Sequence, residues 1–278
     1  MMAAHGRLKV YLGATPGAGK TFAMLRESLQ RKQRGEDVVI AYVETYGRAR
    51  IEELLPGLDQ IPRKKIPYRG TVLEEMDVDA VLERRPTIAL VDELAHTNAP
   101  GSANEKRWQD IEQLRDAGID IISTLNVQHV ESVNDVVEKI TGIVQRETIP
   151  DRVLDLADEV QFIDISPEAL RKRMRHGNIY QPEKVETALA NFFRPGNLAA
   201  LREIALRLVA QSMATSREVM APAEDVLVAI SGSAESEPLI RRAVRLARGL
   251  GGLCMVVMVG SGGGVNKERY QRLSAQLG

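Results

Sequence analysis

The sequence of 278 residues has little cysteine, few aromatic residues and no long apolar run. Its single cysteine, Cys254, excludes an intrachain disulfide framework and a cysteine-rich zinc site, which fits a reducing, cytosolic setting. The first residues lack the apolar stretch of a secretory signal peptide. No segment approaches the roughly 20 apolar residues that span a bilayer. We therefore expect a cytoplasmic chain that does not itself insert into a membrane.

The sequence also lacks an excess of charge of either sign. Lys and Arg total 37 and Asp and Glu total 38, so the formal net charge is -1. Binding to nucleic acid phosphates relies on a basic surplus, so nucleic acid is not expected as a partner. The remaining composition, 44% hydrophobic and 27% charged, is that of a globular chain long enough for one large domain or two.

Short apolar runs alternate with segments of helical periodicity along the first 165 residues. We expect strands at residues 8–12, 38–43, 88–91, 119–125 and 160–163. Helices are expected at residues 21–34, 48–55, 77–83, 105–117 and 132–140, and Ser166 and Pro167 predict a further helix N-terminus. Continuously apolar strands separated by helices are typical of a parallel sheet covered on both faces. The predicted fold class is therefore α/β, with a mostly parallel sheet.

A glycine-rich motif lies between the first strand and the first helix. Residues 13–21 read Gly-Ala-Thr-Pro-Gly-Ala-Gly-Lys-Thr, which matches the phosphate-binding pattern G-x-x-x-x-G-K-[ST] except that Ala14 replaces the first glycine. Backbone N–H groups of such a loop, and the N-terminus of the next helix, point at phosphate oxygens. Lys20 is then placed to reach the β- and γ-phosphates, and Thr21 offers its hydroxyl to Mg²⁺.

The motif predicts an ATP site in a P-loop NTPase fold. Its cofactor-binding residues would be Pro16, Gly17, Ala18, Gly19, Lys20 and Thr21. The alternative, a glycine-rich turn with an accidental lysine, is disfavoured because the motif follows a strand and precedes an amphipathic helix.

Two carboxylates follow the third apolar strand, at Asp92 and Glu93. In P-loop proteins an acid at such a strand end helps to hold Mg²⁺, which makes Asp92 a metal-binding candidate together with Thr21. Glu93 is the candidate catalytic residue that would polarise an attacking water. The alternative is that both simply cap the strand end in solvent.

Polar residues also follow the other strands at the edge where such sheets bind ligands. Arg48 follows the second strand and Asn126 the fourth, and both are predicted to contact the nucleotide. Each such residue is explained equally well as a turn or cap residue, but the set favours a site. Its other members are Glu44, Thr45, His96, Thr97, Asn98, Gln128 and His129.

Residues 6–212 resemble the N-terminal domain of the KdpD family of potassium- and osmolarity-responsive sensor histidine kinases. The similarity is carried by the motif at residues 13–21 and by residues 43–48, 90–102, 106–110, 124–129, 133–136, 150–154 and 191–194. The chain differs from the family pattern at Tyr46, where the family often has histidine, and at residues 103–105, which are usually more basic.

This resemblance implies an ATP-binding regulatory domain with slow hydrolysis or none. In this family the domain tunes the kinase-to-phosphatase balance of a membrane sensor, whose response regulator controls potassium uptake. The remaining domains of the sensor kinase would be its partners. The sequence contains no membrane helix, phosphoacceptor-histidine helix or kinase ATP lobe, so we expect a portion of a sensor or a short stand-alone relative.

A second unit is predicted after residue 220. We place the nucleotide-binding domain at residues 1–220, ending with a helix at 198–213, and a second domain at 225–278. A strand at 225–231, a helix at 236–250 and a strand at 253–259 resemble the start of a universal stress protein domain. About 50 residues bury little surface, so this unit would pack on the first domain, pair with another copy or be partly disordered.

Ser231 and Ser233 lie at the turn where a sheet of this kind binds nucleotides. Some KdpD relatives bind cyclic di-AMP near a similar turn, which makes that dinucleotide a candidate ligand. The favoured interpretation is a turn and a helix cap, because serine is common there for local reasons.

Two other function classes remain open. One is a stand-alone P-loop small-molecule kinase or ATPase, although the single cysteine excludes the zinc element usual in thymidine kinases. The other is an interaction module with a vestigial loop, which the intact Lys20–Thr21 and Asp92–Glu93 pairs disfavour.

Overall fold

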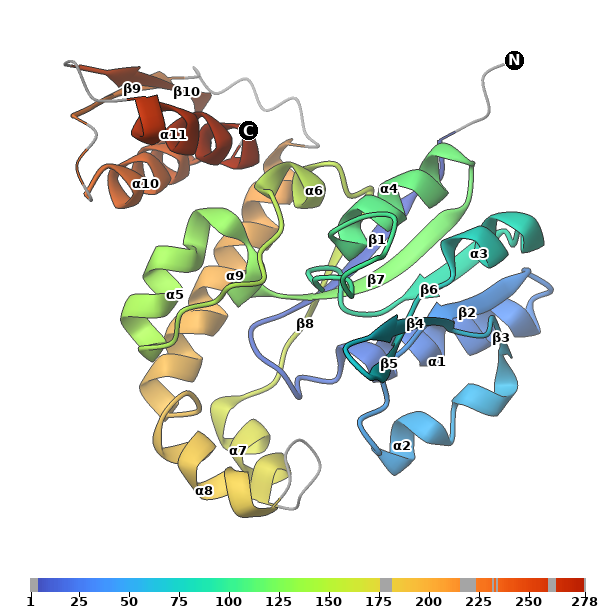
Figure 1. Ribbon diagram of the computed structural model, residues 1–278. Coiled ribbons are helices and arrows are strands. Elements are labelled where there is room, and N and C mark those ends of the chain that lie inside the picture. The colour runs from blue at the N-terminus through green and yellow to red at the C-terminus, as the bar shows by residue number, and fades with distance from the viewer. Residues whose placement is uncertain are drawn as a thin grey trace.

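The computed structural model describes residues 5–175, 182–215, 224–231, 233, 235–259 and 264–277. Six strands form the central sheet in the order β3-β2-β6-β7-β1-β8, and neighbouring strands pair in parallel (Figure 1). The strands are β1 (Leu8–Gly13), β2 (Val38–Tyr42), β3 (Asp59–Gln60), β6 (Ile88–Val91), β7 (Asp120–Asn126) and β8 (Glu159–Ile163). The predicted α/β class with a parallel sheet is confirmed.

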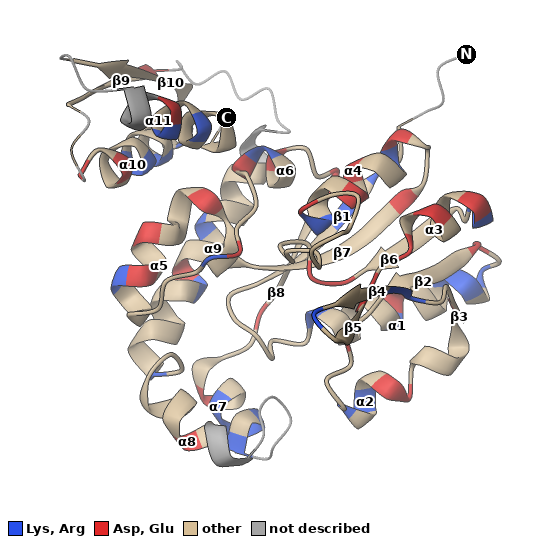
Figure 2. Ribbon diagram, in the orientation of Figure 1, with Lys and Arg blue, Asp and Glu red and all other residues tan. Residues whose placement is uncertain are grey.

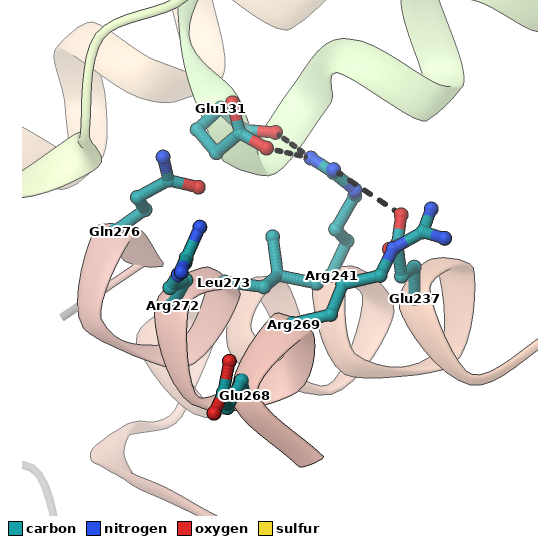
Figure 3. A pocket seen from close by; sticks show the side chains of 8 residues that line it. All are labelled: Glu131, Glu237, Arg241, Glu268, Arg269, Arg272, Leu273 and Gln276. Carbon is teal, nitrogen blue, oxygen red and sulfur yellow. Dashed lines mark hydrogen bonds and ion pairs between the residues drawn. The ribbon is translucent and has the colours of Figure 1, made fainter. Parts of the chain in front are cut away.

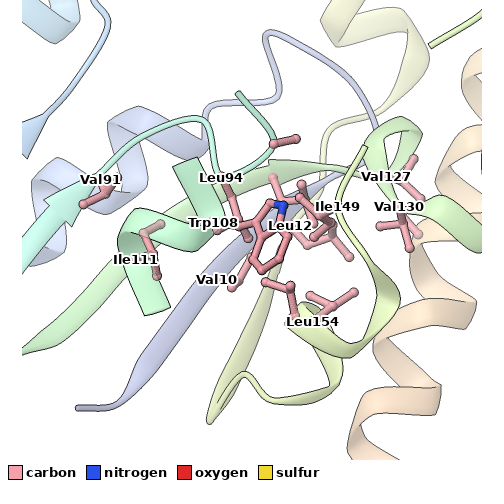
Figure 4. Close-up of a cluster of buried hydrophobic side chains, with 14 of the residues drawn as sticks. Val10, Leu12, Val91, Leu94, Trp108, Ile111, Val127, Val130, Ile149 and Leu154 are labelled. Atoms are coloured by element: carbon pink, nitrogen blue, oxygen red, sulfur yellow. The ribbon is translucent and has the colours of Figure 1, made fainter. Parts of the chain in front are cut away.

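Helices cover both faces of this sheet. Helix α1 (Lys20–Gln33) packs on one face, where Tyr11 of β1 joins Met24 and Leu25. Helices α3 (Val78–Arg84), α4 (Arg107–Asp116) and α9 (Pro195–Thr215) lie on the other. There Val10 and Leu12 enter the larger core beside Trp108 (Figure 4). Alternate residues of β1 therefore enter different cores, because successive side chains of a strand point to opposite faces.

Two predicted helices are shorter than expected. The helix predicted at 48–55 is wrong beyond Glu52: α2 (Ala49–Glu52) ends and a 3₁₀ turn, η1 (Leu55–Gly57), follows. Pro56 has no backbone N–H to donate to the carbonyl oxygen of Glu52, so the α-helical hydrogen-bond pattern cannot continue through it. The segment predicted at 132–140 begins as the 3₁₀ turn η3 (Glu131–Val133) and continues as α5 (Asn134–Thr141).

Strands β4 (Lys64–Tyr68) and β5 (Thr71–Glu75) form a β-hairpin that was not predicted from the sequence. Arg69 and Gly70 form its turn with φ of 45° and 80°. Positive φ at both central residues is the requirement of the tight turns that suit hairpins. Glu75, the last residue of the hairpin, pairs with Arg107 at the start of α4.

Further short elements complete the first unit. They are η2 (Val127–His129), α6 (Asp151–Asp155), α7 (Pro167–Arg175) and α8 (Pro182–Ala190). The predicted cap of α7 is confirmed, because Ser166 Oγ accepts a hydrogen bond from the backbone N–H of Ala169 at 3.2 Å.

The C-terminal residues form a separate small sheet. Strands β9 (Glu224–Ile230) and β10 (Gly251–Met258) pair in parallel, and α10 (Ser236–Gly249) and α11 (Gly264–Leu277) share one core with them. The opposite face exposes Leu227, Leu253 and Met255, at 63%, 76% and 61%. The predicted boundary spans residues 221–224, of which 221–223 lie outside the described residues, as does Gly232.

Charged residues of both signs occur along the helices of both units (Figure 2). In the part of the chain that the structure describes, no helix is both long and apolar enough to cross a membrane.

Candidate functional site

The glycine-rich loop (residues 13–20) joins β1 to α1 at the carboxyl edge of the central sheet. Gly17 and Gly19 have φ of 83° and 106°, a region that side chains other than glycine rarely adopt. A Cβ atom on Gly13 would lie 2.9 Å from Cδ of Lys20. These glycines therefore let the loop curl closely around the Lys20 side chain.

Lys20 is buried inside this loop. Its Nζ donates to Asn126 Oδ1 at 2.5 Å and lies 3.5 Å from the carbonyl oxygen of Thr15. The pKa of Lys20 is lowered to about 8, mainly by burial; the carboxylate of Asp92 acts to raise this pKa and the cation of Arg48 acts to lower it. The structure thus brings the predicted residues Lys20 and Asn126 into direct contact.

Asp92 is held at the end of β6 beside the helix start. Its side chain is buried, and Oδ2 accepts from the Thr21 hydroxyl at 3.0 Å. Its other oxygen, Oδ1, accepts from the Thr124 hydroxyl and from the backbone N–H of Glu93. The predicted metal-binding pair therefore lies together, and its oxygens are of the type that Mg²⁺ prefers.

No group of three or more His, Cys, Asp and Glu side chains that could hold a metal ion exists among the described residues. A Mg²⁺ ion at Thr21 and Asp92 would therefore take most of its oxygens from phosphate and water. This is the usual arrangement for Mg²⁺ in nucleotide sites.

The carboxylate of Glu93 is engaged by a tyrosine. The Tyr46 hydroxyl donates to Glu93 Oε1 across the ends of β2 and β6. Both residues have left-handed backbone conformations, with φ of 50° for Tyr46 and 60° for Glu93. Burial raises the pKa of Glu93, while the Tyr46 hydrogen bond acts in the opposite direction. Non-glycine residues in this conformation are strained and cluster at functional sites.

A buried ion pair between Arg107 and Glu75 lies next to the end of β6. Arg107 is fully buried, and its guanidinium lies 3.7 Å from the centre of the Tyr42 ring and 2.7 Å from Glu75 Oε2. It also donates to the carbonyl oxygen of Asp92 at 3.3 Å and lies 4.0 Å from Glu93 Oε2.

The other oxygen of Glu75 is also engaged, because Oε1 pairs with His96 Nε2 at 3.0 Å. Burial acts to raise the pKa of Glu75, but His96 and Arg107 outweigh it and lower that pKa. Glu75 therefore carries a negative charge between His96 and Arg107.

Sequence reasoning selected neither Arg107 nor Glu75. Arg107 stands next to Trp108 on a helix, where a charged residue is usually assigned to solvent. Glu75 lies in the hairpin that was not predicted, so the pairing could be found only in three dimensions.

Arg173 was also missed. It projects from α7 onto the glycine-rich loop, where Nη1 donates to the carbonyl oxygens of Gly17 and Ala18 at 3.3 Å each. Gly17 and Ala18 belong, with Pro16, to the predicted phosphate-binding residues. A basic run on the helix after β8, the strand beside β1, was the available signal.

The remaining predicted polar residues divide into two groups. Arg48 lies near the site, with its guanidinium 5.1 Å from the centre of the Tyr46 ring. Its buried Nε has no hydrogen-bond partner in the described part of the chain. Asn98 instead donates to Asp110 at 2.7 Å, and His129 Nδ1 lies 2.8 Å from the carbonyl oxygen of Glu147. These last contacts stabilise loops.

Four other residues of the predicted set make no hydrogen bond or ion pair with the glycine-rich loop within the described part of the chain. Glu44 pairs with Arg63 and Thr45 contacts Glu52, while Thr97 accepts from Lys106, all within the first unit. Gln128 is buried, and its Oε1 has no hydrogen-bond partner among the described residues.

Comparison with known proteins identifies relatives along nearly the whole chain. Residues 4–213 match the family model described as "KdpD: Osmosensitive K+ channel His kinase sensor domain". The Sensor protein KdpD of Mycobacterium tuberculosis is 52% identical over 290 residues, which cover 99% of this chain and 34% of that protein. The Sensor protein KdpD of Escherichia coli is 47% identical over 92% of this chain and 30% of its own length.

The chain thus spans about a third of the length of these relatives. The family match covers the central sheet, its helices and every residue of the site described above. The chain belongs to the KdpD family, in which its residues 4–213 correspond to the sensor domain that the family model describes.

Proposed function

We propose that this chain is a cytoplasmic ATP-binding regulatory domain of a KdpD-type two-component histidine kinase that controls potassium uptake. The observation that carries the proposal is the joint placement of Lys20, Thr21 and Asp92 around one curled loop. A cation, a hydroxyl and a carboxylate in this order match the needs of a triphosphate and its Mg²⁺. The similarity to proteins named Sensor protein KdpD supports the sensor role.

Nucleotide binding would exchange one set of hydrogen bonds for another. Lys20 would leave Asn126 and the Thr15 carbonyl for the β- and γ-phosphate oxygens. Thr21 and Asp92 would hold Mg²⁺, which neutralises phosphate charge. Arg48 and Arg173 are the nearby cations, and Arg48 already has an unpartnered Nε. Backbone N–H groups around Gly17 and Gly19 complete the cradle.

The same geometry favours slow hydrolysis. Glu93 is the carboxylate placed to polarise water, but its Oε1 accepts from Tyr46. A base that is already hydrogen-bonded is less available to a water molecule. A domain that holds its nucleotide suits a sensor whose output depends on occupancy, with the remaining domains of the longer relatives as its partners.

Calorimetric titration with a non-hydrolysable ATP analogue and Mg²⁺ tests the proposal. Lys20→Ala should remove one or two charge-assisted hydrogen bonds, each about 1.5–3 kcal/mol, or roughly tenfold to hundredfold in affinity. Lys32→Ala is the matched control, because Lys32 lies on the same helix but pairs with Asp59 at the surface. Equal affinities of the wild type and Lys20→Ala would contradict the site.

A P-loop small-molecule kinase or ATPase is the second candidate. Glu93 favours it, because burial raises its pKa and a carboxylate of raised pKa beside a phosphate site suits proton transfer. Phosphate release or nucleoside phosphorylation at about 10 per second, a typical enzyme rate, would replace the sensor proposal with this one.

Cyclic di-AMP binding at Ser231 and Ser233 stays a prediction. The carbonyl oxygen of Ser233 accepts from Ser236 N–H and from the Tyr270 hydroxyl at 2.9 Å, contacts that serve the turn itself. Calorimetry with cyclic di-AMP on this chain, and on a version extended to a whole stress domain, would decide between a turn and a ligand site.

A further inference from the structure

Three arginines of α10 hold the C-terminal unit against the first unit. Arg241, Arg245 and Arg248 recur at helical spacing on one face of α10, and together we call them the arginine clasp. Arg241 donates to the Glu131 carboxylate and to its carbonyl oxygen (Figure 3). Arg245 pairs with Asp135 at 2.8 Å.

Arg248 pairs with the most buried carboxylate of the clasp. Its Nη1 donates to Asp151 Oδ2 at 2.6 Å, and the Asp151 side chain is completely buried. The second Asp151 oxygen accepts from the backbone N–H of Ser132 at 2.9 Å. One carboxylate therefore ties α10 to the start of η3, which makes this contact more specific than a solvent-exposed ion pair.

Among the described residues the apolar cores of the two units are separate, and ion pairs join the units. Beside the clasp lies a hollow of about 400 Å³. Its lining includes Glu131 of the first unit together with Arg272 and Gln276 of α11 (Figure 3). Polar contacts of this kind are typical of units that move relative to one another.

Residues 126–131 connect the glycine-rich loop to the arginine clasp, because they contact Lys20 at one end and Arg241 at the other. Strand β7 ends at Asn126, which accepts from Lys20, and Glu131 follows five residues later. Between them Val127 and Val130 are completely buried. The backbone N–H of Glu131 bonds to the carbonyl oxygen of Ile149 at 3.2 Å. Because residues 126–131 form a short and packed connection, we expect a displacement of Asn126 to move Glu131 as well.

We propose that nucleotide binding at the glycine-rich loop and docking of the C-terminal unit are linked with opposite sign through residues 126–131. The inference rests on the proposed function. In the structure the Lys20–Asn126 hydrogen bond holds residues 126–131 in the position in which Glu131 pairs with Arg241 of the arginine clasp. Phosphates would withdraw Lys20 from Asn126 and release the segment. By reciprocity, a docked C-terminal unit holds Asn126 in place and weakens nucleotide binding.

The test measures affinity for a non-hydrolysable ATP analogue with Mg²⁺ by calorimetry. The double variant Arg241→Ala/Arg245→Ala should bind about fivefold more tightly, at the lower end of typical couplings between sites. Asp135→Asn removes the Arg245 partner from the other side of the interface and should act in the same direction. Arg242→Ala is the matched control, because Arg242 is exposed on the same helix.

Hydrogen exchange supplies a readout that needs no nucleotide. Asn126→Ala removes the Lys20 contact and should speed amide exchange in η3 and α10, whereas Arg242→Ala should not. Unchanged or weaker nucleotide affinity in the clasp variants would overturn the linkage. If the wild type binds no ATP, the proposed function fails, and the exchange result alone decides whether residues 126–131 connect the two units.

Discussion

Replacing Lys20 by methionine should make the nucleotide-free protein more stable while it weakens nucleotide binding. The reason is that the folded chain holds a buried ammonium group for a ligand. Burial lowers the pKa of Lys20 from 10.5 to about 8, which corresponds to a cost of about 3 kcal/mol for the charged form. Methionine has a similar length and no charge, so Lys20→Met removes this cost.

The gain is offset by one lost hydrogen bond. Asn126 Oδ1 loses the Lys20 donor, and an unsatisfied buried acceptor costs about 1–3 kcal/mol. The difference leaves Lys20→Met more stable than the wild type by about 1 kcal/mol at pH 7. Asn126 serves as the internal check, because Asn126→Ala removes the same bond but leaves the buried charge, and should destabilise.

The advantage of Lys20→Met should depend on pH in a defined direction. Between pH 8 and 10.5 the unfolded chain keeps a proton on Lys20 that the folded chain has lost. Stability of the wild type therefore rises with pH across that window through this group. Because each pH unit in this window is worth about 1.4 kcal/mol, the advantage of Lys20→Met should vanish within about one unit above pH 8 and reverse towards the upper end of the window.

Urea denaturation monitored by tryptophan fluorescence measures these values. Trp108 is the only tryptophan and packs in the core of the central sheet, so the signal reports the unit that holds Lys20. A loss of more than about 1 kcal/mol in Lys20→Met at pH 7, a full factor of five or more in the unfolding equilibrium, would refute the reasoning. So would a stability difference that does not change with pH.

Three further perturbations follow from the site. Arg107→Met leaves the Glu75 carboxylate buried without its main cation and should cost about 3–5 kcal/mol by urea denaturation, with partial recovery when Glu75→Gln is added. Asp92→Asn should reduce the dependence of nucleotide affinity on Mg²⁺, measured by titration with and without the metal. Tyr46→Phe frees the Glu93 carboxylate and should raise phosphate release severalfold, below the roughly 10²–10⁴-fold that a fully effective general base contributes, whereas adding Glu93→Gln should remove the gain.

The glycine-rich loop and the parallel sheet could be predicted because their signals are local. The positive φ values of Gly17 and Gly19 belong to residues whose type already indicated them. The apolar runs of the buried strands also needed no information from distant residues. The Thr21–Asp92 contact followed from these elements, because parallel strands bring their carboxyl ends to one edge of the sheet.

The supporting contacts could not be predicted, because each joins residues with no sequence relation. The β4–β5 hairpin begins with Lys64 and Lys65 and lacks a clean apolar alternation, so Glu75 could not be placed under Arg107. The basic character of α10 was visible in the sequence. Its acidic partners are spread over residues 131–155, and only the folded arrangement places them opposite the arginines.

The exposed face of the small sheet has a consequence for handling the protein. Leu227, Leu253 and Met255 form an apolar row on two strands, and each strand has one unpaired edge within its sheet. Such surfaces are templates for association between chains. Sulfate and other excluded salts strengthen contacts of this type, so they will lower the concentration at which solutions of this chain stay monodisperse. Solution conditions for the binding experiments are therefore set by the C-terminal unit, although the nucleotide site belongs to the first.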